Sequence, residues 1–310
     1  STTATAHSVA FNNTTDVTNA ATFQGSGTLT LGNGGDTLTF TGGVTATAGP
    51  KTISGTIVSA AGAVNFDTTT TTLNGLSSID TTNSGGSPAG ANITLNAVTG
   101  TQDFTVNAGT GGTVTINGIL GSTNDLNTLD LDAGAITQNA EIQAGGLIDI
   151  DVPGTFSTGA AITSTAGQVQ ITTTGDLTIA ANVTGATGVT LNATNIAATL
   201  THSAGTIDGA DSTLLLQADE MAFTGGGAIG NAGTDVVTLR PNDLADAIEV
   251  GSADTAANDI LELADAELDT ITGVLTIGTT GVTGGITVTA AVDTLNVTDM
   301  SLVAGSAGND

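Results

Sequence analysis

The chain has 310 residues, with 29 acidic side chains against two basic ones, Lys51 and Arg240, and a formal net charge of −27. So few cations exclude ordinary binding to nucleic-acid phosphates, which requires clustered Lys and Arg, and argue against attraction to anionic membrane surfaces. The chain has no Cys, Trp or Tyr, which excludes disulfides and thiolate metal sites. No apolar run approaches the roughly 18 residues of a membrane-spanning helix. We therefore expect a soluble protein with no nucleic-acid partner and no membrane insertion.

Residues 1–85 consist of short apolar–polar alternations joined by glycine turns, and these predict strands. We treat 1–85 as an N-terminal β region that either forms the first coils of a larger stack or serves in strand exchange and assembly. Ser8–Phe11 is the candidate for a strand donated to a neighbouring copy. Gly85–Gly90 is either a linker or a long loop between coils. The clearest strand segments are Thr28–Leu31, Thr37–Phe40 and Ala63–Phe66.

A four-residue pattern of alternating apolar and polar residues recurs along residues 86–310. Each copy predicts a half-buried strand with one inward and one outward face. One such strand cannot cover its apolar face alone, so the recurrence predicts coils that stack and bury a continuous core. The fold class we predict is all-β: a parallel β-helix (β-solenoid) with coils of about 19–25 residues. The copies are Ile93–Asn96, Val114–Asn117, Leu129–Asp132, Ile148–Asp151, Val169–Thr172, Val189–Asn192, Val237–Arg240, Leu261–Ala264, Ile286–Thr289 and Leu295–Thr298.

Two smaller features accompany this repeat. The segments 241–248 and 263–271 have helix-like spacing, and we expect one helical turn at a corner of the solenoid from each. Asn recurs just after strands, and stacked Asn side chains at one corner would hydrogen-bond along the solenoid. We interpret these residues as a structural ladder rather than a ligand site. They are Asn74, Asn96, Asn107, Asn117 and Asn192.

The sharpest candidate site is acidic. Asp130 and Asp132 share one outward face of a strand, as do Asp149 and Asp151. If the 19-residue step between the two copies is one coil, Asp130 lies beside Asp149 and Asp132 beside Asp151. Four carboxylates within about 5 to 7 Å repel one another, and a hard cation such as calcium would relieve the repulsion. The alternative, which the pattern favours, is a solvated face screened by salt.

A second cation candidate is Asp36, within Gly32–Leu38, which fits most of the Gly-x-Gly-x-Asp-x-apolar unit of calcium-binding β-rolls. Such β-rolls repeat the unit many times, whereas here it occurs once, so an ordinary glycine-rich turn is the alternative. The two histidines, His7 and His202, are far apart in sequence and have no Cys or second His nearby. We expect both on the surface rather than as metal ligands.

Composition argues against an enzyme. Many β-helices act on polysaccharides, but such sites need basic and aromatic residues, and only Lys51 and Arg240 are available. No Gly-x-Ser-x-Gly nucleophile motif is present. Paired carboxylates remain the one route to glycosidase chemistry. Ice binding is a further alternative, because arrays of Thr-x-Thr on β-solenoids resemble the ice-facing surfaces of some antifreeze proteins, although Thr is also the favoured outward strand residue. The pairs are Thr28/Thr30, Thr37/Thr39, Thr45/Thr47, Thr113/Thr115 and Thr287/Thr289.

Residues 90–300 resemble the repeat region of filamentous-haemagglutinin-like bacterial surface proteins and other β-strand-repeat proteins. The resemblance implies a right-handed parallel β-helix, secretion, and a role in surface adhesion or filament formation. It supplies no catalytic residue, and it does not extend to the family's N-terminal secretion domain, so it leaves the export route open. The phrases that carry it are Val237–Asn242, Leu261–Ile271, Leu275–Gly278, Gly175–Ile179 and Gly188–Ala193.

We therefore predict a structural extracellular protein of the cell surface, not an enzyme. It would form a fibre, sheath or adhesin stalk by head-to-tail stacking or strand exchange between copies, because the open ends of a solenoid expose unpaired strand edges. Its principal partner is itself, with surface glycans as a further candidate. No cofactor is required, and calcium is the candidate for stabilising the acidic sites. An ice- or glycan-binding solenoid is the alternative function, and a polysaccharide-active enzyme ranks below it.

Overall fold

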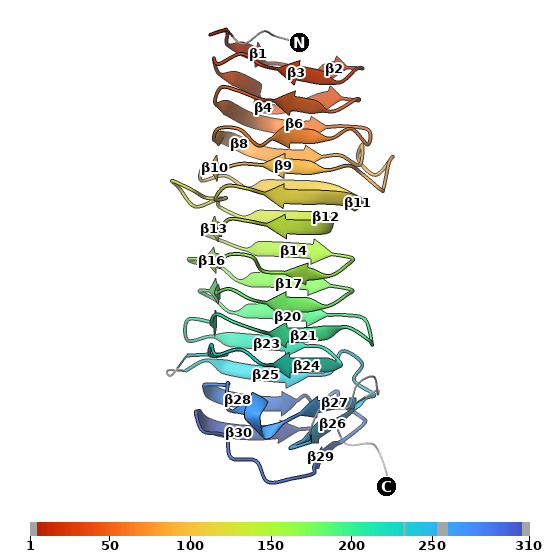
Figure 1. The fold of residues 1–310 in the computed structure, drawn as a ribbon, viewed down its shortest axis with the longest axis vertical. Coiled ribbons are helices and arrows are strands. Elements are labelled where there is room, and N and C mark those ends of the chain that lie inside the picture. Colours follow the sequence, from red (N-terminus) through yellow and green to blue (C-terminus); the bar gives the residue numbers. More distant parts are fainter. Residues whose placement is uncertain (1–4, 232–233, 253–259, 306–310) are drawn as a thin grey trace. The chain divides into compact units, whose positions relative to one another are not determined.

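The alternation of apolar and polar residues forms strands whose apolar side chains point inward, coil upon coil. The computed structural model describes residues 5–231, 234–252 and 260–305. In them the chain is a parallel β-solenoid of about 13 turns with almost no helix, which confirms the predicted fold class (Figure 1). It divides into two units, residues 1–153 and 154–310.

The first unit contains 14 described strands that pair in parallel along three faces of the coils. One face runs through β1 and the first halves of β4, β6 and β8, a second through β2 and the second halves of the same strands, and a third through β3, β5, β7 and β9. The strands are β1 Val9–Phe11, β2 Thr15–Val17, β3 Ala21–Phe23, β4 Leu29–Phe40, β5 Val44–Ala46, β6 Lys51–Val58, β7 Val64–Phe66, β8 Thr71–Asp80, β9 Ile93–Leu95, β10 Val98–Thr99, β11 Phe104–Ile116, β12 Leu129–Gln138, β13 Ile142–Ala144 and β14 Ile148–Val152.

The second unit repeats the three-faced coil up to about residue 240. The three series are β15–β18–β21–β24, β16–β19–β22 and β17–β20–β23–β25–β28–β30. The strands and the one described helix are β15 Phe156–Ser157, β16 Ile162–Ser164, β17 Val169–Thr173, β18 Leu177–Ile179, β19 Val183–Gly185, β20 Val189–Ala193, β21 Thr199–His202, β22 Ile207–Asp208, β23 Thr213–Gln217, β24 Glu220–Phe223, β25 Val236–Arg240, β26 Ala247–Val250, β27 Ile260–Leu263, α1 Asp265–Leu268, β28 Gly273–Gly278, β29 Ile286–Val288 and β30 Val297–Val303.

The core is a set of columns of buried Val, Ile, Leu and Phe, one column for each inward strand position. Leu131 in β12 pairs with Ile150 in β14, and neither side chain has any exposed surface. Burying an aliphatic side chain of this size contributes about 1.5–3 kcal/mol. Because the columns are continuous within each unit, every coil supplies the cover that its neighbour lacks.

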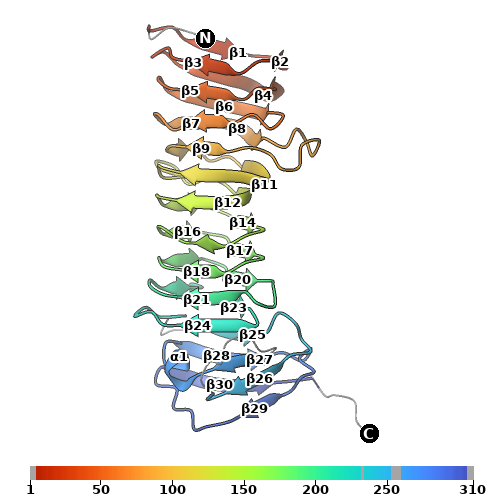
Figure 2. The same cartoon turned by 45° about the vertical axis from the view of Figure 1, so that its right-hand side comes forward.

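Residues 1–85 are paired directly with the strands that follow them. β8 pairs with β11 and β7 pairs with β9, so the glycine-rich break at Gly85–Gly90 is a loop between coils. This loop, which runs from β8 to β9, projects from the stack (Figure 2). It is held at its base by the Asp80 carboxylate, which accepts hydrogen bonds from the backbone N–H groups of Thr82 and Ser84. The candidate donor strand also lies in the stack, because β1 pairs with β4 of its own chain.

Most of the predicted four-residue copies, or cassettes, are strands. In three places, however, successive cassettes do not pair as neighbouring coils. The cassettes that begin at Val114 and Leu129 do not pair with each other. Leu129 pairs with Phe104, and Val114 pairs with Ile136. Val237 pairs with Leu275, 38 residues further on, because β26 and β27 form a separate series in which β26 lies between β27 and β29. The Leu295–Thr298 cassette is wrong as a core strand.

Leu295 is 69% exposed, and the strand in this region is β30, which begins at Val297. Of the two helix-like segments, only the second contains a helical turn, α1. The first is a turn followed by β26, because the Asp219 carboxylate accepts the backbone N–H groups of Asn242 and Asp243 and bends the chain there.

Candidate functional site

The acidic cassettes meet as the sequence predicts. β12 and β14 pair in register, with Asp130 opposite Asp149 and Asp132 opposite Asp151. Burial raises the pKa of Asp149 to about 6, and repulsion by the other three carboxylates adds to that rise. The pKa values of Asp130 and Asp132 are raised by the same two causes, burial before repulsion. The Oδ1 atom of Asp149 is buried and has no hydrogen-bond partner. Ionisation of this face therefore destabilises the folded chain.

The described residues contain no group of three or more His, Cys, Asp or Glu side chains arranged to hold a metal ion. Calcium at the acidic face thus stays a prediction. The second cation candidate, Asp36, has a local role: its Oδ2 accepts the backbone N–H of Asn33 at 2.9 Å. That hydrogen bond closes the glycine-rich bulge Gly32–Gly35, at which β4 shifts its register against β6. The glycine-rich motif therefore forms a corner of the coil.

The asparagine ladder forms at one corner of the first unit. Asn139 Nδ2 donates to Asn117 Oδ1 at 2.9 Å, Asn117 Nδ2 to the Asp67 carboxylate at 2.6 Å, and Asn96 Nδ2 to the Asp67 backbone carbonyl at 2.8 Å. Asn96 and Asn117 were predicted members, whereas Asp67 and Asn139 were missed although they also directly follow strands. Such a ladder ties successive coils together.

The other three predicted ladder members do not hydrogen-bond to the Asn side chains of neighbouring coils. Asn107 accepts the backbone N–H of Gly109 within its own turn, and Asn74 is exposed in the bulge of β8. Asn192 lies in the second unit, and its Oδ1 is buried without a partner. The five predicted Asn residues therefore have different roles, and of these five only Asn96 and Asn117 join the ladder.

The two basic residues are both hydrogen-bonded between coils, Lys51 inside the wall and Arg240 at a half-buried outward position. The Lys51 side chain is fully buried, and its Nζ donates to Thr69 Oγ1 at 2.8 Å and to the carbonyls of Thr68 and Gly49. Burial lowers the pKa of Lys51 to about 8. Arg240 donates from Nε and from one terminal nitrogen to Gln217 Oε1. Both cations thus link neighbouring coils by hydrogen bonds rather than line a cleft.

His202 corrects one prediction. His7 is exposed as expected, but His202 has no exposed surface. It continues an inward column between Ile179 and Phe223. Its Nε2 lies 2.9 Å from the Gly205 carbonyl, so the neutral ring donates there, and its buried Nδ1 has no partner. Burial lowers the pKa of the ring, although the Gly205 carbonyl opposes this shift.

The second unit also buries carboxylates that sequence reasoning missed. Asp235 has no exposed surface, and it accepts the backbone N–H groups of Gly209, Ser212 and Asn231. Glu267 accepts the N–H groups of Phe223 and Ala264. Asp235 thus joins its own turn to donors 23 and 26 residues away, and Glu267 caps its own helix at Ala264 and also reaches Phe223, 44 residues away. The cap is a local pattern of the sequence, whereas the long-range hydrogen bonds are not.

The predicted Thr-x-Thr pairs do not stack into a two-column array. Thr37 pairs with Thr56, but Thr39 pairs with Val58; Thr113 pairs with Ala135. Single outward columns are regular instead, with one residue from each successive coil. On the first face Thr30, Thr52, Thr72 and Thr99 stack in this way, and a longer column lies on the third face of the first unit. It consists of Thr22, Thr45, Asn65, Thr94, Thr115 and Thr137.

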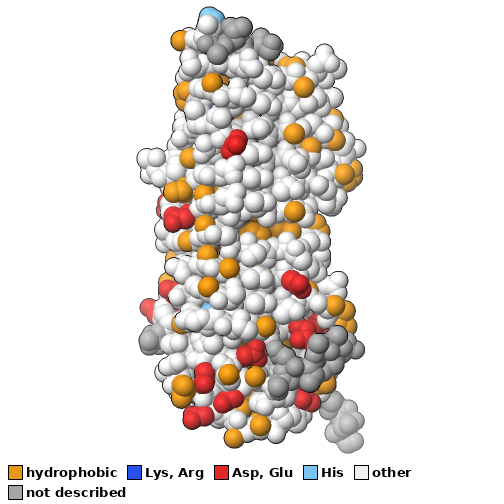
Figure 3. All heavy atoms as spheres, viewed as in Figure 1, with side chains coloured by type: hydrophobic (Ala, Val, Ile, Leu, Met, Phe, Trp, Pro, Cys, Tyr) orange, Lys and Arg blue, Asp and Glu red, His pale blue; other side chains and the backbone are white. Residues whose placement is uncertain are grey.

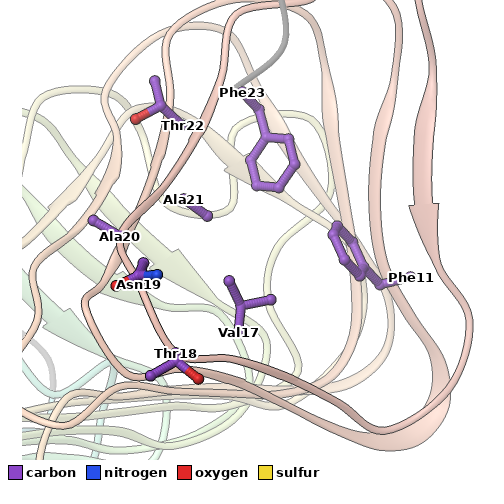
Figure 4. Close-up of a pocket in the computed structure, with 8 residues that line it drawn as sticks. All are labelled: Phe11, Val17, Thr18, Asn19, Ala20, Ala21, Thr22 and Phe23. Carbon is purple, nitrogen blue, oxygen red and sulfur yellow. The ribbon is translucent and has the colours of Figure 1, made fainter.

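At the N-terminal end of the first unit, no described strand pairs with the outer edges of β1, β2 and β3. Phe11, Phe23 and Phe40 pack edge to face, with ring centroids 5.7 to 6.4 Å apart. Beside them is a hollow of about 340 Å³, into which Phe11, Val17 and Phe23 point (Figure 4). The hollow is also lined by Thr18, Asn19, Ala20, Ala21 and Thr22.

At the C-terminal end of the second unit, no described strand pairs with the outer edges of β29 and β30. Met300 and Leu302 continue the inward columns of Leu275 and Ile277, yet they are 39% and 42% exposed. Val288 in β29, which continues the column of Val250, is 55% exposed. Among the described strands, nothing covers these side chains.

These features define the chain as an acidic parallel β-solenoid protein. Among its described residues, no helix has the length and apolar character needed to cross a bilayer. The chain matches no protein-family model, no curated protein and no solved structure. The resemblance to filamentous-haemagglutinin-like proteins therefore stays a prediction.

Proposed function

We propose that this chain is a non-catalytic structural protein of the cell exterior, a subunit or segment of a fibre, sheath or adhesin stalk that assembles end to end with copies of itself. The observation that carries the proposal is the pair of open ends. β1, β2 and β3 each pair on one side only in the described part of the chain, and the same holds for β29 and β30. Such edges with apolar side chains beside them favour association.

The hydrogen bonds between coils support the same proposal. The buried Lys51 and the half-buried Arg240 donate hydrogen bonds to neighbouring coils, and the buried carboxylates of Asp235 and Glu267 accept backbone N–H groups. Polar side chains used in this way stabilise a long stack rather than act on a substrate. The high negative charge favours solubility outside the cell and means that closely packed copies repel one another. Calcium would lessen that repulsion, so we propose that it strengthens assembly.

Sedimentation velocity over a hundredfold range of protein concentration tests this proposal. We expect a series of larger species that grows with concentration, extends further with millimolar calcium and shrinks with a chelator. A magnesium control separates specific calcium binding from general screening of charge. A single monomeric species at every concentration, with and without calcium, would contradict self-assembly.

The column of Thr22, Thr45, Asn65, Thr94, Thr115 and Thr137 favours a second candidate, binding of ice or of a neutral glycan along that face. Adjacent strands lie about 4.8 Å apart, so the column offers a regular line of polar groups. Thermal hysteresis and a glycan array test the two ligands. Loss of either activity in Thr94→Lys, but not in Leu76→Lys on the exposed bulge of β8, is the expected result.

A further inference from the structure

The proposed function leaves open which ends meet and which residues form the joint. In a parallel solenoid each coil has one edge toward the preceding coil and one toward the next. The first described coil lacks a partner on the preceding side and the last lacks one on the following side. Joining a first coil to a last coil therefore continues parallel pairing, as in the rest of the stack.

The two ends differ in charge. Residues 5–50 contain two acidic residues, whereas the equally long segment 260–305 contains six. At the C-terminal end Asp293 and Asp299 are exposed. On the face drawn in Figure 3, acidic side chains are sparse over the first coils and numerous over the last. Two C-terminal ends brought together would repel each other, and a C-terminal end meets less repulsion at an N-terminal end.

The two ends also complement each other in shape. The hollow beside Phe11 and Phe23 is concave and lined by apolar side chains, including Ala21, that continue the inward columns. Met300 and Leu302 stand uncovered on the last strand. Their flexible and branched side chains suit a hollow of about 340 Å³.

We propose that the hollow at the N-terminal end takes Met300 and Leu302 of a second copy of this chain. This inference rests on the proposed function, and it names the joint and its direction. Repetition of one heterologous contact of this kind builds an open filament with a polarity.

The test uses one charged substitution at each end. Ala21→Glu puts a carboxylate into the hollow while removing little packing, and Leu302→Asp puts one on the facing strand. A charge that must lose water in the joint opposes association, so each variant alone should associate at least tenfold more weakly than the wild type. Leu76→Asp is the matched control, because Leu76 is 70% exposed on the bulge of β8, away from both ends. It should assemble as the wild type does.

Mixing the two end variants decides the direction. Ala21→Glu keeps an intact C-terminal end and Leu302→Asp keeps an intact N-terminal end. Sedimentation of an equimolar mixture should give heterodimers and nothing longer. Far-ultraviolet circular dichroism of each variant confirms that it is folded, and Met300→Asp and Val17→Asp replace any variant that is not.

Each other outcome overturns the inference in its own way. Dimers of Leu302→Asp alone would mean that two N-terminal ends meet, and dimers of Ala21→Glu alone that two C-terminal ends do. End variants that assemble like the wild type, or a Leu76→Asp variant that fails to assemble, would place the contact elsewhere while self-assembly stands. A wild type that stays monomeric would overturn the proposed function as well.

Discussion

The two units build the same three-faced coil but place their ionisable side chains differently. In the first unit the clustered charges lie on the outward side of the strands, as in Asp130 and Asp149. In the second unit several lie inside, as His202 and Asp235 do. A solenoid thus tolerates an ionisable group on either side of its wall. The outward carboxylates destabilise the folded chain as the pH rises, whereas the buried His202 destabilises it as the pH falls.

The directions follow from the pKa shifts. The pKa of Asp149 is raised in the folded state to about 6, so the folded chain binds its proton more tightly than the unfolded chain does. The destabilisation caused by ionising Asp149, from burial first and repulsion second, is therefore absent below about pH 4 and complete above about pH 7. The pKa of His202 is lowered by burial. Its neutral form is accommodated above about pH 6.5, and stability is lost as the pH falls below that value.

The largest effect should come from Asp235, the buried acceptor of three backbone N–H groups. Asp235→Ala leaves those donors without a partner, and we expect a loss of about 3 kcal/mol in the unfolding free energy of the second unit. Urea unfolding followed by circular dichroism measures this. Asp235→Asn, which keeps one acceptor oxygen, should recover part of the loss, and Asp211→Asn, at an exposed position, should change little. An unchanged unfolding midpoint for Asp235→Ala would contradict a stabilising role for the Asp235 carboxylate.

The next effect sharpens the contrast in pH response. His202→Leu removes the buried ring nitrogen and keeps an apolar side chain in the column of Ile179 and Phe223. We expect the variant to lose less stability than the wild type between pH 7.5 and pH 5. The exposed His7→Leu variant is the control and should follow the wild type. Equal acid sensitivity of His202→Leu and the wild type would show that other groups dominate.

The acidic face should respond in the opposite sense. Asp149→Asn removes the carboxylate that is repelled by three others. We expect it to stabilise the chain by about 1 kcal/mol at pH 8, after allowance for solvent screening, and to have no effect at pH 4. Thermal unfolding at both pH values measures the difference, with Asp16→Asn on an outward strand position as the control. A gain of equal size at pH 4 would mean that the effect is not electrostatic.

The smallest effect concerns the ladder. Asn117→Ala breaks the hydrogen bonds to Asp67 and Asn139. Both lie at an exposed corner, so we expect a loss of about 0.5–1 kcal/mol. Urea unfolding tests it against Asn33→Ala, an exposed asparagine outside the ladder. A loss above about 3 kcal/mol would mean that the corner does more than hold neighbouring coils.

The strand pattern predicts the fold because period-2 alternation and a coil-length period are both local properties of the sequence. Leu129 and Ile148 head nearly identical cassettes, so their register, and with it the four-carboxylate face, could be derived. The position of β27 between β24 and β26 could not, because the Leu261 cassette alternates like any other and nothing local says which coil it joins. Three-dimensional pairing decides that.

The burial of His202 could also have been predicted from the alternation of the strand pattern. The alternation in Thr199–His202 places His202 on the inward side with Leu200, and following it would have predicted a buried ring. The long-range hydrogen bonds of Asp235 and Glu267 were beyond reach, because the N–H groups of Gly209, Ser212 and Phe223 come from segments 23 to 44 residues away. Whether the acidic face holds a cation depends on side-chain geometry, which residue spacing alone does not determine.

Electron microscopy of the wild-type chain at rising concentration tests assembly end to end. We expect filaments with one polarity that are longer with calcium and shorter with chelator. Discrete particles of one copy at every concentration and in both ionic conditions would contradict end-to-end assembly.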